Sequence, residues 1–249
     1  QAPDHLECIY PSFKDNDDFL NLILETKPRA VSFHFGIPHP HQIQALKKAG
    51  ILTMVSATNF AEAKAIEAAG IDIIVAQGIE AGGHRGVFST KFDASVKTSN
   101  LVKLIRQHSS LPVVAAGGIM DGQQARLMLD FGAEAVQLET AFVQCKSSNA
   151  NEDYRKALLS KPLTQVSASI SGRPARGIIN HWHMEVDTPD RLDVPAYPYT
   201  YDLAKQLNAA AAKHGDKGYG AFWAGSNVAQ IREMEASDLI NQLVLEMSH

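Results

Sequence analysis

The sequence of 249 residues has only two cysteines, Cys8 and Cys145, and it lacks the patterns that mark several large classes of protein. Two cysteines this far apart exclude a disulfide framework and a CxxC metal or redox pair. No stretch approaches the roughly 20 consecutive apolar residues that a membrane-crossing helix needs. The net charge is −4 and no Lys/Arg run stands out, which argues against nucleic acid. We therefore expect neither a membrane nor a nucleic acid among its partners.

Several familiar ligand motifs are also missing. The chain has no GxGxxG dinucleotide fingerprint, no GxxxxGK[ST] phosphate loop and no GxSxG hydrolase turn. His181 and His183 have the residue type of metal ligands, but no third ligand of matching spacing accompanies them, so no metal site is expected. The first residues have neither a basic start nor a long apolar run, unlike a signal peptide. A cytoplasmic setting is the default expectation.

What the sequence does contain is a repeated unit of helix, glycine and apolar strand, seen at 48–51, 68–71 and 130–133. Strands that recur about every 20 residues are typical of parallel βαβ units. We expect strands at 30–35, 51–57, 71–76, 112–116 and 135–138, and helices at 15–26, 42–48, 59–69, 99–108, 122–131 and 154–159. Two folds account for this pattern: an open doubly wound sheet, or a TIM-type (β/α)8 barrel of which about five of eight βα units are present.

The rhythm stops near residue 161. We assign residues 1–159 to the barrel portion and residues 160–249 to a mostly helical C-terminal subdomain that covers the barrel end, with helices at 203–213 and 228–246. The segment 171–177 is expected to be a turn-rich basic loop with Arg173 and Arg176 in solvent. The small and aromatic segment 218–225 is a candidate to fold over a ligand.

The stretch 71–88 is the candidate centre of function, because an apolar strand leads directly into a glycine-rich loop around His84. Glycine lets the backbone approach a ligand closely, and histidine exchanges protons near neutral pH. We therefore predict that His84 is catalytic. Arg85 could hold an anion or pair with Glu80. His34, near the end of an earlier strand, either faces a ligand or is a satisfied core histidine.

A phosphate site is predicted at the turns that follow the strands 112–116 and 135–138. Gly117 and Gly118 end the first strand, and 137–140 follows the second. Parallel α/β folds bind ligands at these strand ends, where free backbone N–H groups and helix N-termini attract phosphate. The alternative is that the two glycines merely form a tight turn.

Four blocks in order carry a family resemblance: VSFHFG at 31–36, TNFAEAKAIEAAGIDIIVAQGIEAGGHRGVF at 58–88, PVVAAGGIMDG at 112–122 and VQLETAFVQC at 136–145. They resemble the nitronate monooxygenases, formerly called 2-nitropropane dioxygenases. Weaker matches are SGRPARGIIN and FWAGS. The related flavin enoyl reductases share parts of the pattern, but the GGHRG and SFHFG blocks fit the monooxygenases better.

The resemblance implies a barrel with non-covalent FMN that oxidises alkyl nitronates, such as propionate 3-nitronate, with O₂ to a carbonyl compound and nitrite. The substrate partners would be a nitronate or nitroalkane and O₂. His84 would remove the α-proton of a neutral nitroalkane or, protonated, hold the nitronate anion, and His34 would share its pocket as a second catalytic residue. The implied flavin contacts are Gln77, Gly82, Gly83, Gly117, Gly118, Gln137, Leu138, Glu139 and Thr140.

Two departures from the family pattern matter. Glu139 stands where the family usually has glycine, and a carboxylate beside a phosphate would weaken binding unless it points outward. Family members also begin with further strands, so an incomplete barrel with exposed sheet edges is predicted, which favours association and leaves a homo-oligomer open. Two alternatives remain: an NAD(P)H-dependent flavin or enoyl reductase of the same barrel family, or a non-catalytic flavin- or phosphate-binding remnant.

Overall fold

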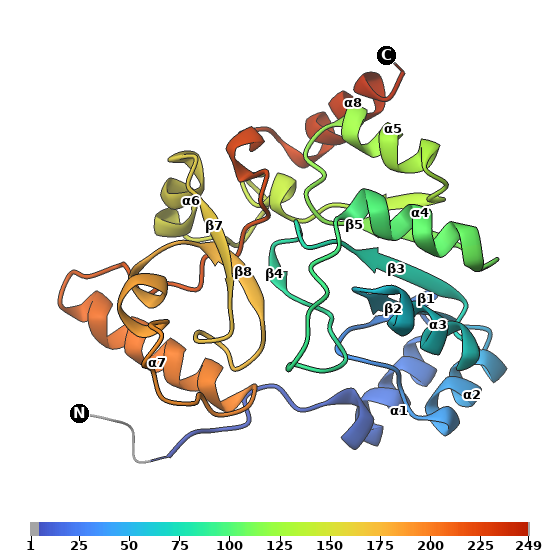
Figure 1. The fold of residues 1–249 in the computed structure, drawn as a ribbon, viewed down its shortest axis with the longest axis horizontal. Coiled ribbons are helices and arrows are strands. Elements are labelled where there is room, and N and C mark those ends of the chain that lie inside the picture. Colours follow the sequence, from blue (N-terminus) through green and yellow to red (C-terminus); the bar gives the residue numbers. More distant parts are fainter. Residues whose placement is uncertain (1–4, 249) are drawn as a thin grey trace.

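The computed structural model describes residues 5–248, and its centre is a curled sheet of five parallel strands (Figure 1). The strands are β1 (Ala30–Phe33), β2 (Leu52–Ala57), β3 (Ile73–Gln77), β5 (Val113–Ala116) and β6 (Ala135–Gln137). Their spatial order, β1-β2-β3-β5-β6, follows the chain without reversal, and all neighbours pair in parallel. A doubly wound sheet reverses its order at a switch point, so this order excludes that alternative and shows a half-barrel sheet.

One face of the sheet is covered by helices that flank its strands in the chain. These are α1 (Asp17–Thr26), α2 (Pro40–Lys48), α3 (Phe60–Ala68), α4 (Thr98–His108) and α5 (Gly122–Asp130). Leu46, Ile66 and Ile105 from the helices and Ile74 from β3 are fully buried in the core between the two layers. The strands and helices predicted from the sequence over this part are confirmed, with small shifts at their ends.

Signals close to the helix ends explain why these helices and strands could be predicted from the sequence. The side chain of Asn59 caps α3 by accepting a hydrogen bond from the Glu62 N–H, and Asp121 caps α5 in the same way from Gln124. Gly70, between α3 and β3, has φ of +75°, the left-handed conformation that glycine adopts most easily after a helix. Local chemistry therefore fixes where α3 and α5 begin and where α3 ends.

The C-terminal part differs from its prediction, because it contains a second sheet beside its helices. Strands β7 (Thr164–Ser167) and β8 (Ala175–Ile178) form an antiparallel pair, and β8 also pairs with β4 (Gly83–His84). The description of this part as mostly helical is incomplete, and 171–177 is not simply a basic loop. These strands are short and lack a clear apolar alternation, so their structure depends on pairing with each other and, for β8, with the distant β4.

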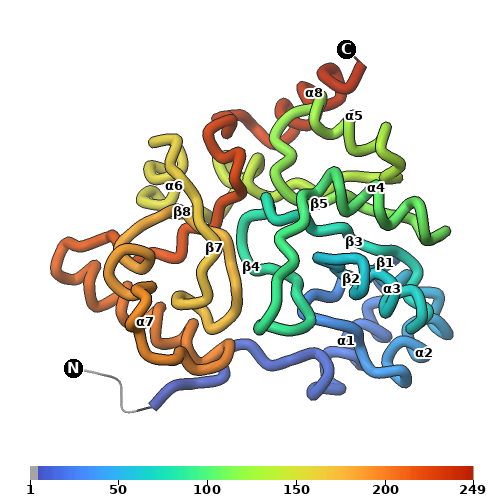
Figure 2. The backbone as a smooth tube through the Cα atoms, viewed as in Figure 1, coloured from blue at the N-terminus to red at the C-terminus, as the bar shows by residue number. Residues whose placement is uncertain are grey.

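The remaining helices are α6 (Glu152–Leu159), α7 (Tyr199–Lys213) and α8 (Ala236–Glu246). The predicted helix at 228–246 is only partly right, since a 3-10 turn at Val228–Gln230 and an extended Ile231 precede α8. Figure 2 shows the chain leaving the sheet, building the region around α7, and returning so that α8 lies beside α5. None of the described helices combines the length and apolar character that a bilayer span requires.

The two edge strands of the described parallel sheet, β1 and β6, leave residues open to solvent. Ala30 and Ser32 on β1 and Ala135 and Gln137 on β6 are exposed. Leu52 on the neighbouring β2 is 48% exposed, which is high for a leucine in a parallel sheet. The described sheet is therefore curled but has two open edges, at β1 and at β6.

Candidate functional site

Two adjoining cavities lie at the carboxyl ends of the parallel strands. The histidine cavity, of about 360 Å³, is lined by His34, Gly83 and His84 among others. The turn cavity, of about 50 Å³, lies against the turns that follow β5 and β6. The walls of the two cavities contain every residue predicted for the site: Gln77, Gly82, Gly83, His34, His84, Gly117, Gly118, Gln137, Leu138, Glu139 and Thr140. Their roles in binding and catalysis stay predictions.

The glycine-rich loop after β3 is held in place by the Gln77 side chain. Its Nε2 donates to the His84 carbonyl at 3.0 Å, and its Oε1 accepts from the Gly86 N–H at 2.8 Å. Gly86 must be glycine, because a Cβ there would lie 2.9 Å from His34 Cε1 and from Ser56 Cβ. Gln77 lines both cavities, yet its amide is used to fix the backbone on either side of Arg85.

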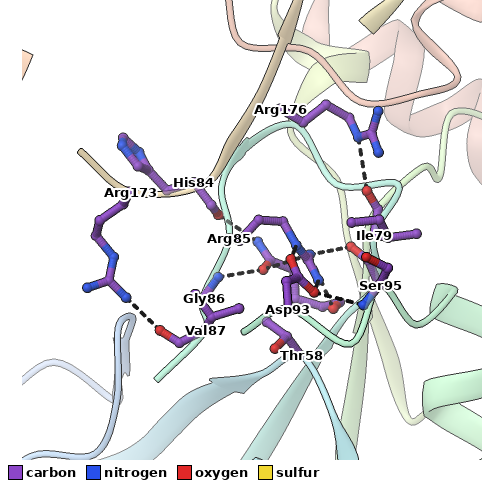
Figure 3. A network of polar contacts seen from close by, with 12 residues as sticks. Thr58, Ile79, His84, Arg85, Gly86, Val87, Asp93, Ser95, Arg173 and Arg176 are labelled. Atoms are coloured by element: carbon purple, nitrogen blue, oxygen red, sulfur yellow. Dashed lines mark hydrogen bonds and ion pairs between the residues drawn. The ribbon is translucent and has the colours of Figure 1, made fainter. Parts of the chain in front are cut away.

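Arg85 is a fully buried structural residue rather than an anion site (Figure 3). Its Nε donates to Asp93 at 2.8 Å, and Nη1 donates to the Gly78 carbonyl at 2.6 Å. Burial tends to raise the pKa of Asp93, but the hydrogen bond and charge of Arg85 outweigh this and lower it. Glu80 instead accepts hydrogen bonds from Thr98, so the expected pairing of Arg85 with Glu80 is wrong.

The two arginines predicted to lie in solvent both reach back to the glycine-rich loop. Arg173 donates from Nη2 to the Val87 carbonyl at 2.5 Å, and Arg176 donates from Nε to the Ile79 carbonyl at 2.9 Å (Figure 3). Their positions follow from β8, which pairs with Gly83 and His84. The prediction of a solvated basic loop is therefore wrong, because β-pairing carries these side chains onto the loop.

The hydrogen bonds of the His84 ring indicate its tautomer. Its Nε2 lies 2.8 Å from Ser171 Oγ, and the Ser171 hydroxyl lies 3.1 Å from the Arg173 carbonyl, which can only accept. With the hydroxyl proton donated to that carbonyl, Ser171 accepts from His84, which assigns the proton to Nε2 and the lone pair to Nδ1. Burial, with smaller effects from the charges of His34 and Arg173, lowers the pKa of His84 to about 4. His84 is therefore neutral at neutral pH.

Both nitrogens of His34 are already engaged. Nε2 lies 3.1 Å from the His84 carbonyl, which can only accept, so Nε2 carries a proton. Nδ1 then accepts from Ser56 Oγ at 2.9 Å. Burial is the main reason that the pKa of His34 is lowered. These contacts indicate that His34 positions the backbone of His84.

An aromatic wall that the sequence did not reveal surrounds His84. The ring centroids of Tyr197, Tyr201 and Trp223 lie 5.3, 5.8 and 5.3 Å from that of His84. Trp223 belongs to the segment 218–225 that was predicted to fold over a ligand, and it does line the histidine cavity. Tyr197 and Tyr201 carry no local signal beyond their spacing of four residues. Only the tertiary fold brings them to His84.

The turn cavity offers backbone donors for an anion, but not the N-terminus of α5. The Gly122 N–H donates to Glu246 Oε2 at 2.8 Å, and Asp121 caps the Gln124 N–H, so side chains close this helix end. The N–H groups of Gly118 and Ile119, in contrast, make no hydrogen bond within the described part of the chain. These two amides are the donors on which the predicted phosphate would depend.

Glu139 points into the cavities, not outward. Its carboxylate lines both of them, and a Cβ on Gly83 would lie 3.9 Å from its Oε2. Burial raises the pKa of this carboxyl group, although the side chain stays open to the cavity. The sequence therefore identified the unusual residue, and the structure shows that its side chain faces any ligand bound there.

A curled parallel sheet with a glycine-rich loop and a neutral histidine at its carboxyl edge defines a TIM-barrel-like fold with a ligand site, and the comparisons with known proteins show that the protein is an oxidoreductase. The family model of nitronate monooxygenases matches residues 11–246. The chain belongs to the nitronate monooxygenase family and is an enzyme of this type.

Individual relatives support the same conclusion. A nitronate monooxygenase from Pseudomonas aeruginosa is 46% identical over 250 residues, covering 99% of this chain and 71% of that protein. One from Paraburkholderia phytofirmans is 48% identical over 248 residues, covering 98% of this chain and 68% of that protein. Among solved structures, nitroalkane oxidase from Streptomyces ansochromogenes has a TM-score of 0.88 at 39% identity, covering 98% of this chain and 71% of that one. FabK from Thermotoga maritima has a TM-score of 0.72 at 27% identity, covering 93% and 72%.

The residues present fit the flavin that the family resemblance implies. Unused amides at Gly118 and Ile119 suit a phosphate, and the histidine cavity, which Phe35 and Trp223 line, suits a planar ring. The cavities adjoin, so one elongated molecule can occupy both. The one residue that a phosphate would avoid is Glu139.

Proposed function

We propose that this enzyme oxidises alkyl nitronates with O₂ to a carbonyl compound and nitrite, with FMN as cofactor. The observation that carries the proposal is that His84 and the turns at Gly118 and Thr140 lie at the walls of two adjoining cavities on one edge of the sheet. Family membership supports nitronates as the substrate class.

The protein's own contribution is to hold the cofactor and shape the site. The amides of Gly118 and Ile119 would bind the phosphate, and Gly82 and Gly83 would let the backbone approach the rest of the molecule. Gly82 must be glycine here, because a Cβ would lie 2.6 Å from the Gly225 nitrogen. When bound, the flavin supplies the electron-transfer chemistry, and the protein supplies orientation and electrostatics.

The tautomer and pKa of His84 separate its two candidate roles. A ring with a pKa of about 4 is neutral near pH 7, so it is poorly suited to hold a nitronate anion as a cation. Its Nδ1 carries a lone pair, because Nε2 donates to Ser171. The neutral ring with a free lone pair is in the protonation state that a base for the α-proton of a neutral nitroalkane requires. A nitronate arrives already deprotonated and does not need this step.

An absorbance experiment on the purified protein tests the proposal. We expect a flavin spectrum that bleaches when propionate 3-nitronate or ethylnitronate is added without oxygen and returns on exposure to air. Nitrite released during aerobic turnover gives an independent readout. Bleaching by NAD(P)H but not by nitronates would favour the reductase, and a protein that binds no added FMN would refute the cofactor assignment.

A further inference from the structure

Glu139 lies where the two cavities of the site meet. Five residues line both cavities, and Glu139 is the only one of them with a formal charge: Gln77, Gly82, Ala116, Gln137 and Glu139. If the phosphate of the flavin rests on the turns and its ring lies beside His84, the junction must hold the ribityl chain that joins them. The inference below thus rests on the proposed function.

The Glu139 carboxylate has no donor to satisfy it within the described residues. Burial alone raises its pKa, and no hydrogen bond or nearby cation counteracts this. The pKa of Tyr154 is raised first by its own burial and then by the charge of Glu139, which shows that the two side chains are neighbours. The Tyr154 hydroxyl, however, donates to the Trp223 carbonyl. The side chain is open to the empty cavity, where water can solvate the carboxylate. A ligand that fills the junction removes that water, so it is expected to provide hydrogen-bond donors in its place.

Only one part of a flavin brings uncharged donors to this place. The phosphate is an anion and would repel a carboxylate. The ring is expected on the His84 side of the histidine cavity, beyond the junction. The ribityl hydroxyls can each donate one hydrogen bond, and hydrogen bonds to a charged acceptor are among the stronger ones.

We propose that the Glu139 carboxylate accepts hydrogen bonds from the ribityl hydroxyls of the bound flavin. Glu139 is then a cofactor-binding residue that this chain carries in place of the glycine usual in the family. Its place at the cavity junction, against Gly83, gives it this contact without touching the turn amides that serve the phosphate.

Three flavins that differ in their side chains test the proposal directly. FMN has ring, ribityl chain and phosphate, riboflavin lacks the phosphate, and lumiflavin lacks the ribityl chain as well. The dissociation constant Kd of each is measured by quenching of flavin fluorescence on titration with the apoprotein. The variants are Glu139→Ala, which removes the acceptor, and Glu139→Gln, which keeps one acceptor oxygen without the charge. Glu25→Gln, on exposed helix α1, is the matched control.

For Glu139→Ala we expect the Kd of riboflavin to rise about tenfold or more and the Kd of lumiflavin to stay within about twofold. The Kd of FMN should rise less than that of riboflavin, because the substitution also removes the repulsion between the carboxylate and the phosphate. Glu139→Gln should fall between Glu139→Ala and the wild type for riboflavin. Equal losses for lumiflavin and riboflavin, or unchanged riboflavin binding in both variants, would overturn the proposal. A wild-type protein that binds FMN leaves the proposed cofactor standing in either case, whereas one that binds no flavin refutes both.

Discussion

At the scale of single residues, the reactivity of His84 depends on one hydroxyl group. Ser171 accepts the hydrogen bond from His84 Nε2 because its own hydroxyl group donates to the Arg173 carbonyl. The same loop brings the positive charge of Arg173 near His84, which adds to burial in lowering the pKa of His84. The tautomer is thus set by residues that follow β7, far from His84 in the chain, and the same residues add to the effects of burial and His34 on the pKa of His84.

Replacing His84 with asparagine, which cannot act as a base, should separate the two substrate forms. We expect turnover of neutral nitroalkanes to fall about 100-fold or more, since general-base catalysis contributes about that much. Turnover of preformed nitronates should change only a few-fold, and FMN should stay bound. Steady-state rates with nitroethane and with ethylnitronate measure the difference. Equal effects on both substrates would contradict a role as base.

Ser171→Ala tests the positioning role of the hydroxyl. Without it, His84 can place its proton on either nitrogen, so we expect a roughly fivefold lower kcat on neutral nitroalkanes, in line with the loss of a hydrogen bond of about 1 kcal/mol. KM should change little, since substrate binding does not need the tautomer. Ser171→Thr, which retains the hydroxyl, should restore kcat. A matching rise in KM, or no rescue by threonine, would indicate a merely structural effect.

At the scale of elements, α8 completes the region of the turn cavity by closing the N-terminus of α5. Glu246 on α8 accepts from the Gly122 N–H and pairs with Arg232 at 2.8 Å. The hydrogen bond from Arg232 is the main reason that the pKa of Glu246 is lowered to about 2. A carboxylate at a helix N-terminus stabilises that helix, so α5 and the turn before it depend on α8.

Glu246→Gln should lower the free energy of unfolding by about 1 kcal/mol, less than the pKa shift alone suggests because the ion pair stays partly exposed and is screened. The pKa of Glu246 is lower in the folded than in the unfolded state. Its contribution is therefore present above about pH 4.5 and lost as pH falls toward 2. Urea unfolding at pH 7 and pH 3 measures this, with Glu25→Gln as control. An equal loss at both pH values would contradict the ion-pair explanation.

The secondary structure elements differ in how well the sequence predicts them. The βα units were predictable because Asn59, Asp121 and Gly70 mark helix ends locally, and the glycine-rich loop stood out around His84. The β4–β8 pairing was not, because a two-residue strand such as Gly83–His84 has no periodicity of its own. Ser171, and the aromatic wall with it, reach His84 only through that long-range packing.

At the scale of the whole molecule, the C-terminal chain ties the site together. The segment after Trp223 crosses the sheet end, where the Gly225 N–H donates to Thr140 Oγ1 at 3.0 Å and Asn227 donates to the Gly118 carbonyl at 2.6 Å. The Ser226 N–H donates to the Glu80 carbonyl at 2.9 Å. The glycine-rich loop and both turns are therefore held by one crossing segment, and unfolding of that segment would open the site.

This shared burial predicts how the stability of the whole protein responds to acid. Burial lowers the pKa of three histidines, His34, His84 and His183, and that of His84 falls from 6.5 to about 4. Between pH 6.5 and pH 4, His84 is protonated in the unfolded chain and neutral in the folded protein. For His84 the free energy of unfolding therefore falls as pH drops from 6.5 to 4, by up to about 1.4 kcal/mol per pH unit, and the other two histidines act in the same direction.

Comparing the wild type with His84→Asn isolates the contribution of one ring. Glu139, whose pKa is raised by burial, acts in the opposite direction above about pH 4.5, but it does so in both proteins. Urea unfolding from pH 7 to pH 4 should give a slope of stability against pH that is smaller in His84→Asn by up to one proton. Identical slopes would mean that the folded His84 titrates like a free imidazole, and a base sheltered beneath the aromatic wall would then be excluded.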